Sequence, residues 1–63
     1  MKLTTKELDI LLSVSEGDNT KHTAIKMGIA VSTVKTHMKN IFLELGAYNG
    51  AHAVAIGIRN GVI

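Results

Sequence analysis

The chain has 63 residues and a formal net charge of +2, and it contains no cysteine and no proline. These totals predict one small domain, residues 1–63, and exclude a disulfide framework or a thiolate zinc site. Hydrophobic residues make up 46% of the chain but aromatic residues only 3%, a balance that favours packed helices over a β-sandwich.

Charges throughout residues 1–18 exclude a secretory signal, and the most apolar tract, residues 51–63, is far shorter than the ~20 residues that span a bilayer. We therefore expect a cytoplasmic protein with no membrane partner.

The positive charge is concentrated in the middle of the chain. Residues 19–43 contain four lysines and no acidic residue. Residues 1–18 contain two lysines against four acidic residues, and in residues 44–63 one glutamate balances one arginine. A surface that faces DNA phosphates needs this segregation, although on charge alone an ordinary solvated face explains it equally well.

The first predicted helix spans residues 5–16. Thr4 is a favourable N-cap, and Glu7, three residues later, completes a capping box. Positions 8, 11, 12 and 15 recur at helical spacing and are predicted to face the core, Leu12 among them, whereas Ser13 falls on the solvent side. Gly17 ends the helix, because glycine adopts the left-handed conformation without strain.

Two further helices follow closely. Residues 18–20 offer N-caps for a short helix over 20–27, which Gly28 ends. A longer helix is expected over 31–45, ended by Gly46. Its predicted core stripe consists of Val34, Met38, Ile41 and Leu45.

The fourth predicted helix, over 51–60, follows a turn at residues 47–50 and ends before Gly61. It has two apolar faces, the first formed by Ala51, Val54, Ala55 and Ile58 and the second by Ala53, Ile56 and Gly57. A helix that is apolar on two sides is normally buried on two sides. Since so small a chain covers only one of them, we expect the other to meet a second copy.

The second and third helices form a helix-turn-helix arrangement. A short helix, a turn of about four residues with a glycine, and a longer basic helix are typical of this motif. In it the first helix crosses the DNA backbone while the second lies in the major groove, where lysine, serine and threonine meet base edges. The four predicted helices indicate an all-α fold. The helix-turn-helix within it predicts double-stranded DNA as the partner.

The run GIAVSTVKTHMKNI at residues 28–41, followed by Leu45-Gly46, resembles the LuxR/FixJ/NarL-type DNA-binding domain. That family's pattern is G-I-S-x-x-T-V-K-x-H-x-x-x-I…K-L-G. Upstream, residues 3–7 resemble its L-T-x-R-E opening, and residues 16–24 its E-G-x-x-x-K-x-I-A segment. The resemblance covers essentially the whole chain, and small stand-alone members resembling the spore regulator GerE likewise begin at the first helix.

The resemblance implies a role for individual residues. Groove contacts would come from Lys35, Thr36 and Lys39, and backbone contacts from Lys21 and the region of Ser32 and Thr33. The fourth helix commonly forms the family's dimer interface, which agrees with the second apolar face. The implied interface residues are Ala53, Ile56, Gly57 and Asn60.

The resemblance also implies a transcription regulator, bacterial or phage-encoded, that forms a homodimer and has RNA polymerase or another regulator as a further partner. Several positions depart from the family pattern. Ala30 stands where a capping serine is usual, so that Ser32 caps instead, and Thr23 replaces a core isoleucine. Glu44 replaces a common lysine, and residues 50–52 replace Arg-Thr-Glu, which removes positive charge near the duplex and weakens a cap.

Catalysis, metal binding and cofactors are not expected. His22, His37 and His52 have no i, i+4 pair among them, and no nucleophile, base and orienting group come together. The alternative to DNA binding is an interaction module that pairs with another transcription regulator through the fourth helix and antagonises it. The modest net charge and Glu44 motivate this alternative.

Overall fold

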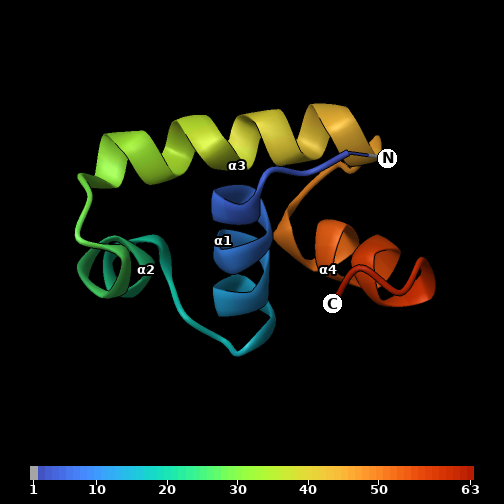
Figure 1. Cartoon of the computed structure of the whole chain (residues 1–63), viewed down its shortest axis with the longest axis horizontal. Coiled ribbons are helices and arrows are strands. Elements are labelled where there is room, and N and C mark those ends of the chain that lie inside the picture. The colour runs from blue at the N-terminus through green and yellow to red at the C-terminus, as the bar shows by residue number, and fades with distance from the viewer. Residues whose placement is uncertain (1) are drawn as a thin grey trace.

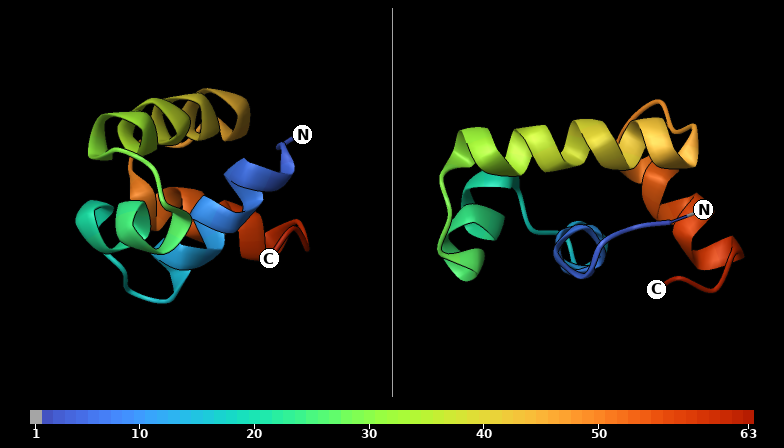
Figure 2. Two further views of the ribbon diagram at one scale, coloured as in Figure 1. Left: turned by 60° about the vertical axis from the view of Figure 1, so that its left-hand side comes forward. Right: turned by 45° about the horizontal axis from the view of Figure 1, so that its top comes forward.

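The computed structural model describes residues 2–63, and in this range the chain forms helices and no strands. The helices are α1 (Thr5–Ser15), α2 (Thr20–Met27), α3 (Val31–Leu45) and α4 (Gly50–Arg59). Figure 1 shows α1 in the middle, with α2 and α4 on either side of it and α3 across all three. The two turned views in Figure 2 show the same arrangement. The predicted all-α fold is confirmed, and every predicted boundary lies within one residue of the observed one.

Side-chain caps fix the starts of three helices. The Glu7 N–H donates to Thr4 Oγ1 at 3.1 Å and the Thr4 N–H donates to Glu7 Oε1 at 3.0 Å, so the predicted capping box is present. Asn19 caps α2 and Asn49 caps α4, each accepting from a backbone N–H at 2.8 Å. Because Asn49 is the cap, α4 begins at Gly50, which was expected to belong to the preceding turn.

The start of α3 differs from the expectation. Its N-cap is Ala30, which makes no side-chain hydrogen bond, and Ser32 lies inside the first turn of the helix. The prediction that Ser32 takes over the capping role is therefore wrong, because a residue with helical backbone cannot occupy the extended N-cap position. A missing capping hydroxyl typically costs about 1 kcal/mol of stability.

The core lies where α1, α3 and α4 meet. Its buried apolar side chains are Ile10, Leu11, Ala24, Val34, Ile41, Leu45 and Ala53. Two positions of α1 contradict the predicted pattern, since Ser13 is buried and Leu12 is 46% exposed. Ser13 faces α2, where Thr23 Oγ1 lies 2.9 Å from its hydroxyl.

The break between α3 and α4 bends the chain by 51°. Gly46 ends α3 in the left-handed conformation, with φ at 66°. Within residues 2–63 no single helix is long and apolar enough to cross a bilayer, and only α3 and α4 taken together have the required length and composition.

Candidate nucleic-acid interface

The helix α3 presents two different faces. Val34 and Ile41 are buried against the other helices, whereas Lys35, Thr36 and Lys39 are exposed. This division follows from the helical period, because residues three and four apart share a face. The Thr36 hydroxyl donates to the Ser32 carbonyl at 3.1 Å, so its only proton is already used and its oxygen remains available as an acceptor.

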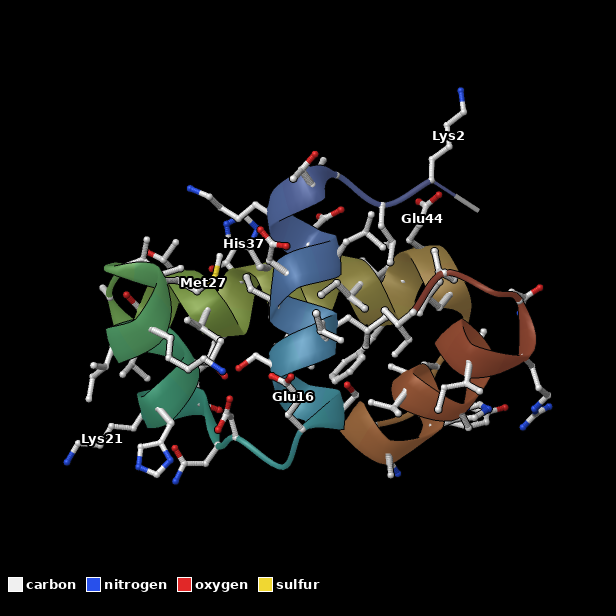
Figure 3. All side chains as sticks on the ribbon, turned by 60° about the horizontal axis from the view of Figure 1, so that its bottom comes forward. Lys2, Glu16, Lys21, Met27, His37 and Glu44 are labelled. Carbon is white, nitrogen blue, oxygen red and sulfur yellow. The ribbon has the colours of Figure 1, made fainter. Side chains whose placement is uncertain are left out.

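The remaining residues predicted to contact DNA are also exposed. Ser32 and Thr33 lie in the first turn of α3. Lys21 lies in the first turn of α2, and Figure 3 shows its side chain extending away from the body of the domain. Helical spacing brings Ser32, Thr36 and Lys39 onto one stripe of α3.

One lysine of the basic segment is paired with acidic residues of the same chain. Lys26 Nζ lies 2.6 Å from Asp18 Oδ2 and 3.4 Å from Glu16 Oε1. Its hydrogen bond to Asp18 raises the pKa of Lys26, while the same bond and the Ser13 hydroxyl lower the pKa of Asp18. The basic surface is therefore smaller than the sequence indicates. Within residues 2–63 the lysines of this segment that form no ion pair are Lys21, Lys35 and Lys39.

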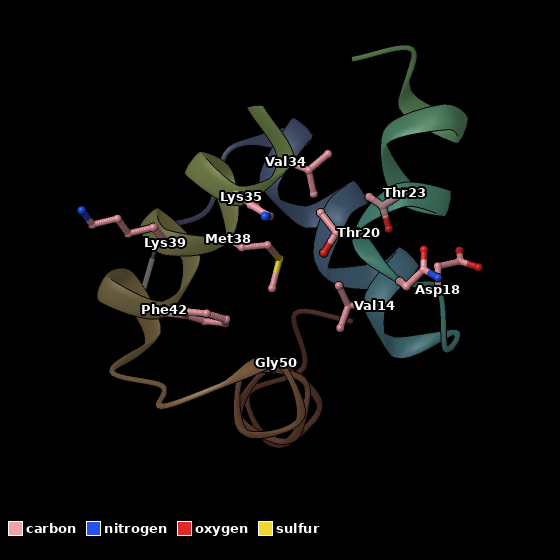
Figure 4. A pocket seen from close by; sticks show the side chains of 11 residues that line it. Val14, Asp18, Thr20, Thr23, Val34, Lys35, Met38, Lys39, Phe42 and Gly50 are labelled. Atoms are coloured by element: carbon pink, nitrogen blue, oxygen red, sulfur yellow. The ribbon is translucent and has the colours of Figure 1, made fainter. Parts of the chain in front are cut away.

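Beside the exposed face of α3 lies a groove of about 490 Å³. It runs between α3 and the residues at which α2 and α4 begin, Thr20 and Gly50. Figure 4 shows Val14, Met38 and Phe42 directed into this space from different helices. Nothing in the sequence pattern singled out the groove, because its lining comes from α1, α2, α3 and α4 together.

The structure corrects the predicted dimer surface on α4. Ala53 is fully buried, and a Cβ added to Gly57 would lie 3.1 Å from Leu11 Cδ2. Ile56 packs partly against the core, and only Asn60 of the predicted set is exposed. The face predicted to meet a second copy thus packs on α1 of the same chain. The opposite face carries the exposed apolar residues, with Ile58 61% exposed.

The three histidines have separate surroundings. His52 stacks on Tyr48 with ring centroids 5.1 Å apart, and its Nδ1 accepts from the Tyr48 N–H at 3.0 Å. His37 is half-buried, and its Nδ1 has no hydrogen-bond partner within the described part of the chain. His22 is exposed on α2. No group of three potential metal ligands occurs among residues 2–63.

Comparison with known proteins places the sequence among bacterial regulators. The family described as "Bacterial regulatory proteins, luxR family" matches residues 1–56. The chain is similar to the transcriptional activator protein EchR of Dickeya chrysanthemi, with 36% identity over 58 residues that make up 92% of this chain and 23% of EchR. It is also similar to the HTH-type transcriptional activator RamA of Corynebacterium glutamicum, with 36% identity over 62 residues that make up 98% of this chain and 22% of RamA.

A solved structure with a similar fold is that of the response regulator ChrA of a heme-sensing two-component system. The match has a TM-score of 0.96 at 30% identity and covers 100% of this chain and 31% of ChrA. The chain therefore spans between 22% and 31% of the length of these three proteins.

Proposed function

Because the chain belongs to the luxR family of bacterial regulatory proteins, we propose that it is a sequence-specific DNA-binding domain that regulates transcription. In this proposal residues 1–63 are one domain, and α3 lies in the major groove of double-stranded DNA. The observation that carries the proposal is the division of α3, with Lys35, Thr36 and Lys39 exposed opposite a buried face. The relatives, which are transcriptional activators and a response regulator by name, support the same conclusion.

The exposed residues suit different parts of a duplex. Lys35 and Lys39 donate hydrogen bonds to guanine O6 and N7 or to phosphates. Thr36 offers an acceptor oxygen to an amino group of cytosine or adenine and a methyl group to thymine. Lys21 and the backbone N–H groups at the start of α3 meet phosphates, which fix the position of the helix in the groove.

The dimer in this proposal forms through the outward face of α4, which consists of the exposed Ala51 and Ile58 and the half-buried Ala55. These residues lie three and four positions apart, so they form one apolar stripe on which the α4 of a second copy can pack. A dimer of this kind reads two half-sites about one helical turn apart, or a multiple of that distance. RNA polymerase or another regulator is a further partner on this view. Neither the fold nor the relatives favour the alternative of an interaction module that antagonises another regulator.

The direct test of DNA binding starts from selection of bound duplexes out of a random pool. On the selected duplex we expect Lys39→Ala to weaken binding by about tenfold, because a specific base contact is worth about 1–3 kcal/mol. Lys6→Ala is the matched control, since Lys6 is an exposed lysine on α1 that is not among the predicted DNA contacts. Three unpaired lysines per protomer also predict that log affinity falls with log salt with a slope of about −3 for each half-site. Unchanged affinity of the Lys39→Ala variant would count against the proposal.

The dimer surface is tested separately. Ile58→Asp places a charge on the exposed face of α4 and should remove the cooperativity with which two protomers bind a two-half-site duplex, measured by sedimentation over a range of protein concentrations. Ile25→Asp, at a residue of α2 that is 69% exposed, is the matched control and should leave the cooperativity unchanged. Cooperative binding by the Ile58→Asp variant would refute this interface.

A further inference from the structure

The groove beside α3 has the size and lining of a small-molecule site. Its volume of about 490 Å³ lies within the range of about 300–1,000 Å³ typical of such sites. Val14, Met38 and Phe42 converge on it from two helices, as Figure 4 shows. An apolar surface of this kind beside charged residues binds ligands that have both an apolar body and a polar head.

The charged groups around the groove favour a negative head. Lys35 and Lys39 line its α3 side, and in Figure 4 Lys35 lies at the edge of the space whereas Lys39 extends outward. The first residues of α2 and α4, Thr20 and Gly50, lie on the opposite side. Helix N-termini carry partial positive charge, so they add to the potential of the lysines.

The acidic residue in the lining does not cancel this potential. Asp18 is in contact with Lys26 at 2.6 Å and accepts from the Ser13 hydroxyl at 2.8 Å. Its negative charge is therefore balanced within the α1–α2 junction. The lining contains no glutamate and no second aspartate.

We infer that the groove binds a small amphipathic carboxylate, with its apolar body on Met38 and Phe42 and its carboxylate beside Lys35. Such a ligand occupies Lys35, which is also a proposed DNA contact, so carboxylate and duplex compete for the protein. The competition rests on the proposed function, whereas carboxylate binding in the groove does not. The two are measured separately.

Binding is tested by titrating the ¹⁵N-labelled protein with sodium octanoate and following the backbone amide resonances. We expect saturable shifts at Thr20, Met38 and Gly50. Acetate, which has the charge without the apolar body, and 1-octanol, which has the body without the charge, should both bind more weakly. Octanoate shifts confined to residues outside the groove, or shifts equally large with acetate, would overturn the inference.

Two variants locate the ligand. Val14→Phe fills the groove from α1 and leaves both lysines in the sequence, and it should weaken octanoate binding by about tenfold, because the body loses its apolar contacts. Val62→Phe, outside the groove lining, is the matched control and should not. If Val14→Phe lowers the melting temperature, the Lys35→Gln variant tests the site without changing the apolar lining. It should weaken octanoate binding about two- to fivefold, as expected for one solvent-screened ion pair, and leave 1-octanol binding unchanged. Unaltered octanoate affinity in a folded Val14→Phe variant or in Lys35→Gln would refute the site.

Competition is measured by fluorescence polarisation on the selected duplex with wild-type protein. Saturating octanoate should lower the apparent DNA affinity, and the loss should be smaller in the Val14→Phe variant. Unchanged DNA affinity with the groove occupied would overturn the competition. Failure of the protein to bind any selected duplex would overturn the proposed function instead, and the amide titration would still decide whether the groove binds a carboxylate.

Discussion

The central helix α1 contacts α2 and α4 through different chemistry. Toward α2 it presents Ser13, whose hydroxyl lies 2.9 Å from Thr23 Oγ1 and donates to Asp18 Oδ2 at 2.8 Å. Toward α4 it presents Leu11, whose Cδ2 would lie only 3.1 Å from a Cβ added to Gly57. One junction is therefore a network of hydrogen bonds, and the other is a close apolar contact.

The two junctions of α1 have different roles in this small domain. Apolar packing is non-directional and roughly proportional to the area buried, so the α1–α4 junction mainly supplies stability. Hydrogen bonds depend on distance and angle, so the α1–α2 junction fixes the position of α2 relative to α1. Since Lys21, in the first turn of α2, belongs to the proposed DNA surface, the polar junction positions a residue for binding.

The largest effect is expected at the apolar junction. Leu11 is fully buried, and Leu11→Ala should lower the free energy of unfolding by about 2–5 kcal/mol through lost burial and the cavity left behind. A domain of this size has little stability to spare, so the variant should be largely unfolded at room temperature. Urea denaturation followed by circular dichroism measures the change.

Leu12→Ala is the matched control on the same helix. Leu12 is 46% exposed, so this variant should lose much less stability. Equal losses for the two variants would show that the apolar junction is not the main source of stability, and the contrast between the junctions would fail.

An intermediate effect is expected at the polar junction. The Ser13 hydroxyl has one proton, which it donates to Asp18, so Thr23 must be the donor in the pair that joins their oxygens. Ser13→Ala leaves a fully buried Thr23 hydroxyl without this acceptor and should cost about 1–3 kcal/mol. Thr23→Val leaves the bond from Ser13 to Asp18 intact and should cost less.

A double-mutant cycle in urea measures this coupling. The double variant, Ser13→Ala with Thr23→Val, should be more stable than the sum of the single losses predicts, because replacing both partners leaves no buried hydroxyl unpaired. Additive losses would show that the two hydroxyls do not interact.

The features predicted correctly are local ones. Thr4 and Glu7 are three residues apart, and the glycines that end the helices act through their own backbone, so their effects can be read from neighbouring positions. The same holds for the division of α3, because one long amphipathic helix has only one way to bury Val34 and Ile41.

The features predicted wrongly depend on contacts between helices. The sequence of α1 alone predicts that Ser13 faces solvent, but in the folded domain α2 places Thr23 opposite it. Both faces of α4 are apolar. The face that packs on α1 is the one with the smaller residues, since Ala53 and Gly57 allow the close approach to Leu11. The pairing of Lys26 joins residues 8 and 10 positions apart, a spacing that no single helix indicates.

The smallest effect is expected from the charge of Asp18, which lies at the edge of the polar junction. Folding lowers the pKa of Asp18 below its ordinary value of 3.8, because Lys26 and Ser13 donate hydrogen bonds to the carboxylate. The unfolded chain then binds the proton more tightly, so this contribution to stability is fully present above pH 3.8 and is lost as the pH falls through the lower pKa of the folded state.

Asp18→Asn should accordingly be less stable than wild type near neutral pH and equally stable in acid, measured by urea denaturation across the pH range. Asp9→Asn, at an exposed residue of α1 without an ion pair in residues 2–63, is the control. A difference between Asp18→Asn and wild type that persists unchanged into acid would show that the shape of the side chain, and not its charge, matters at this junction.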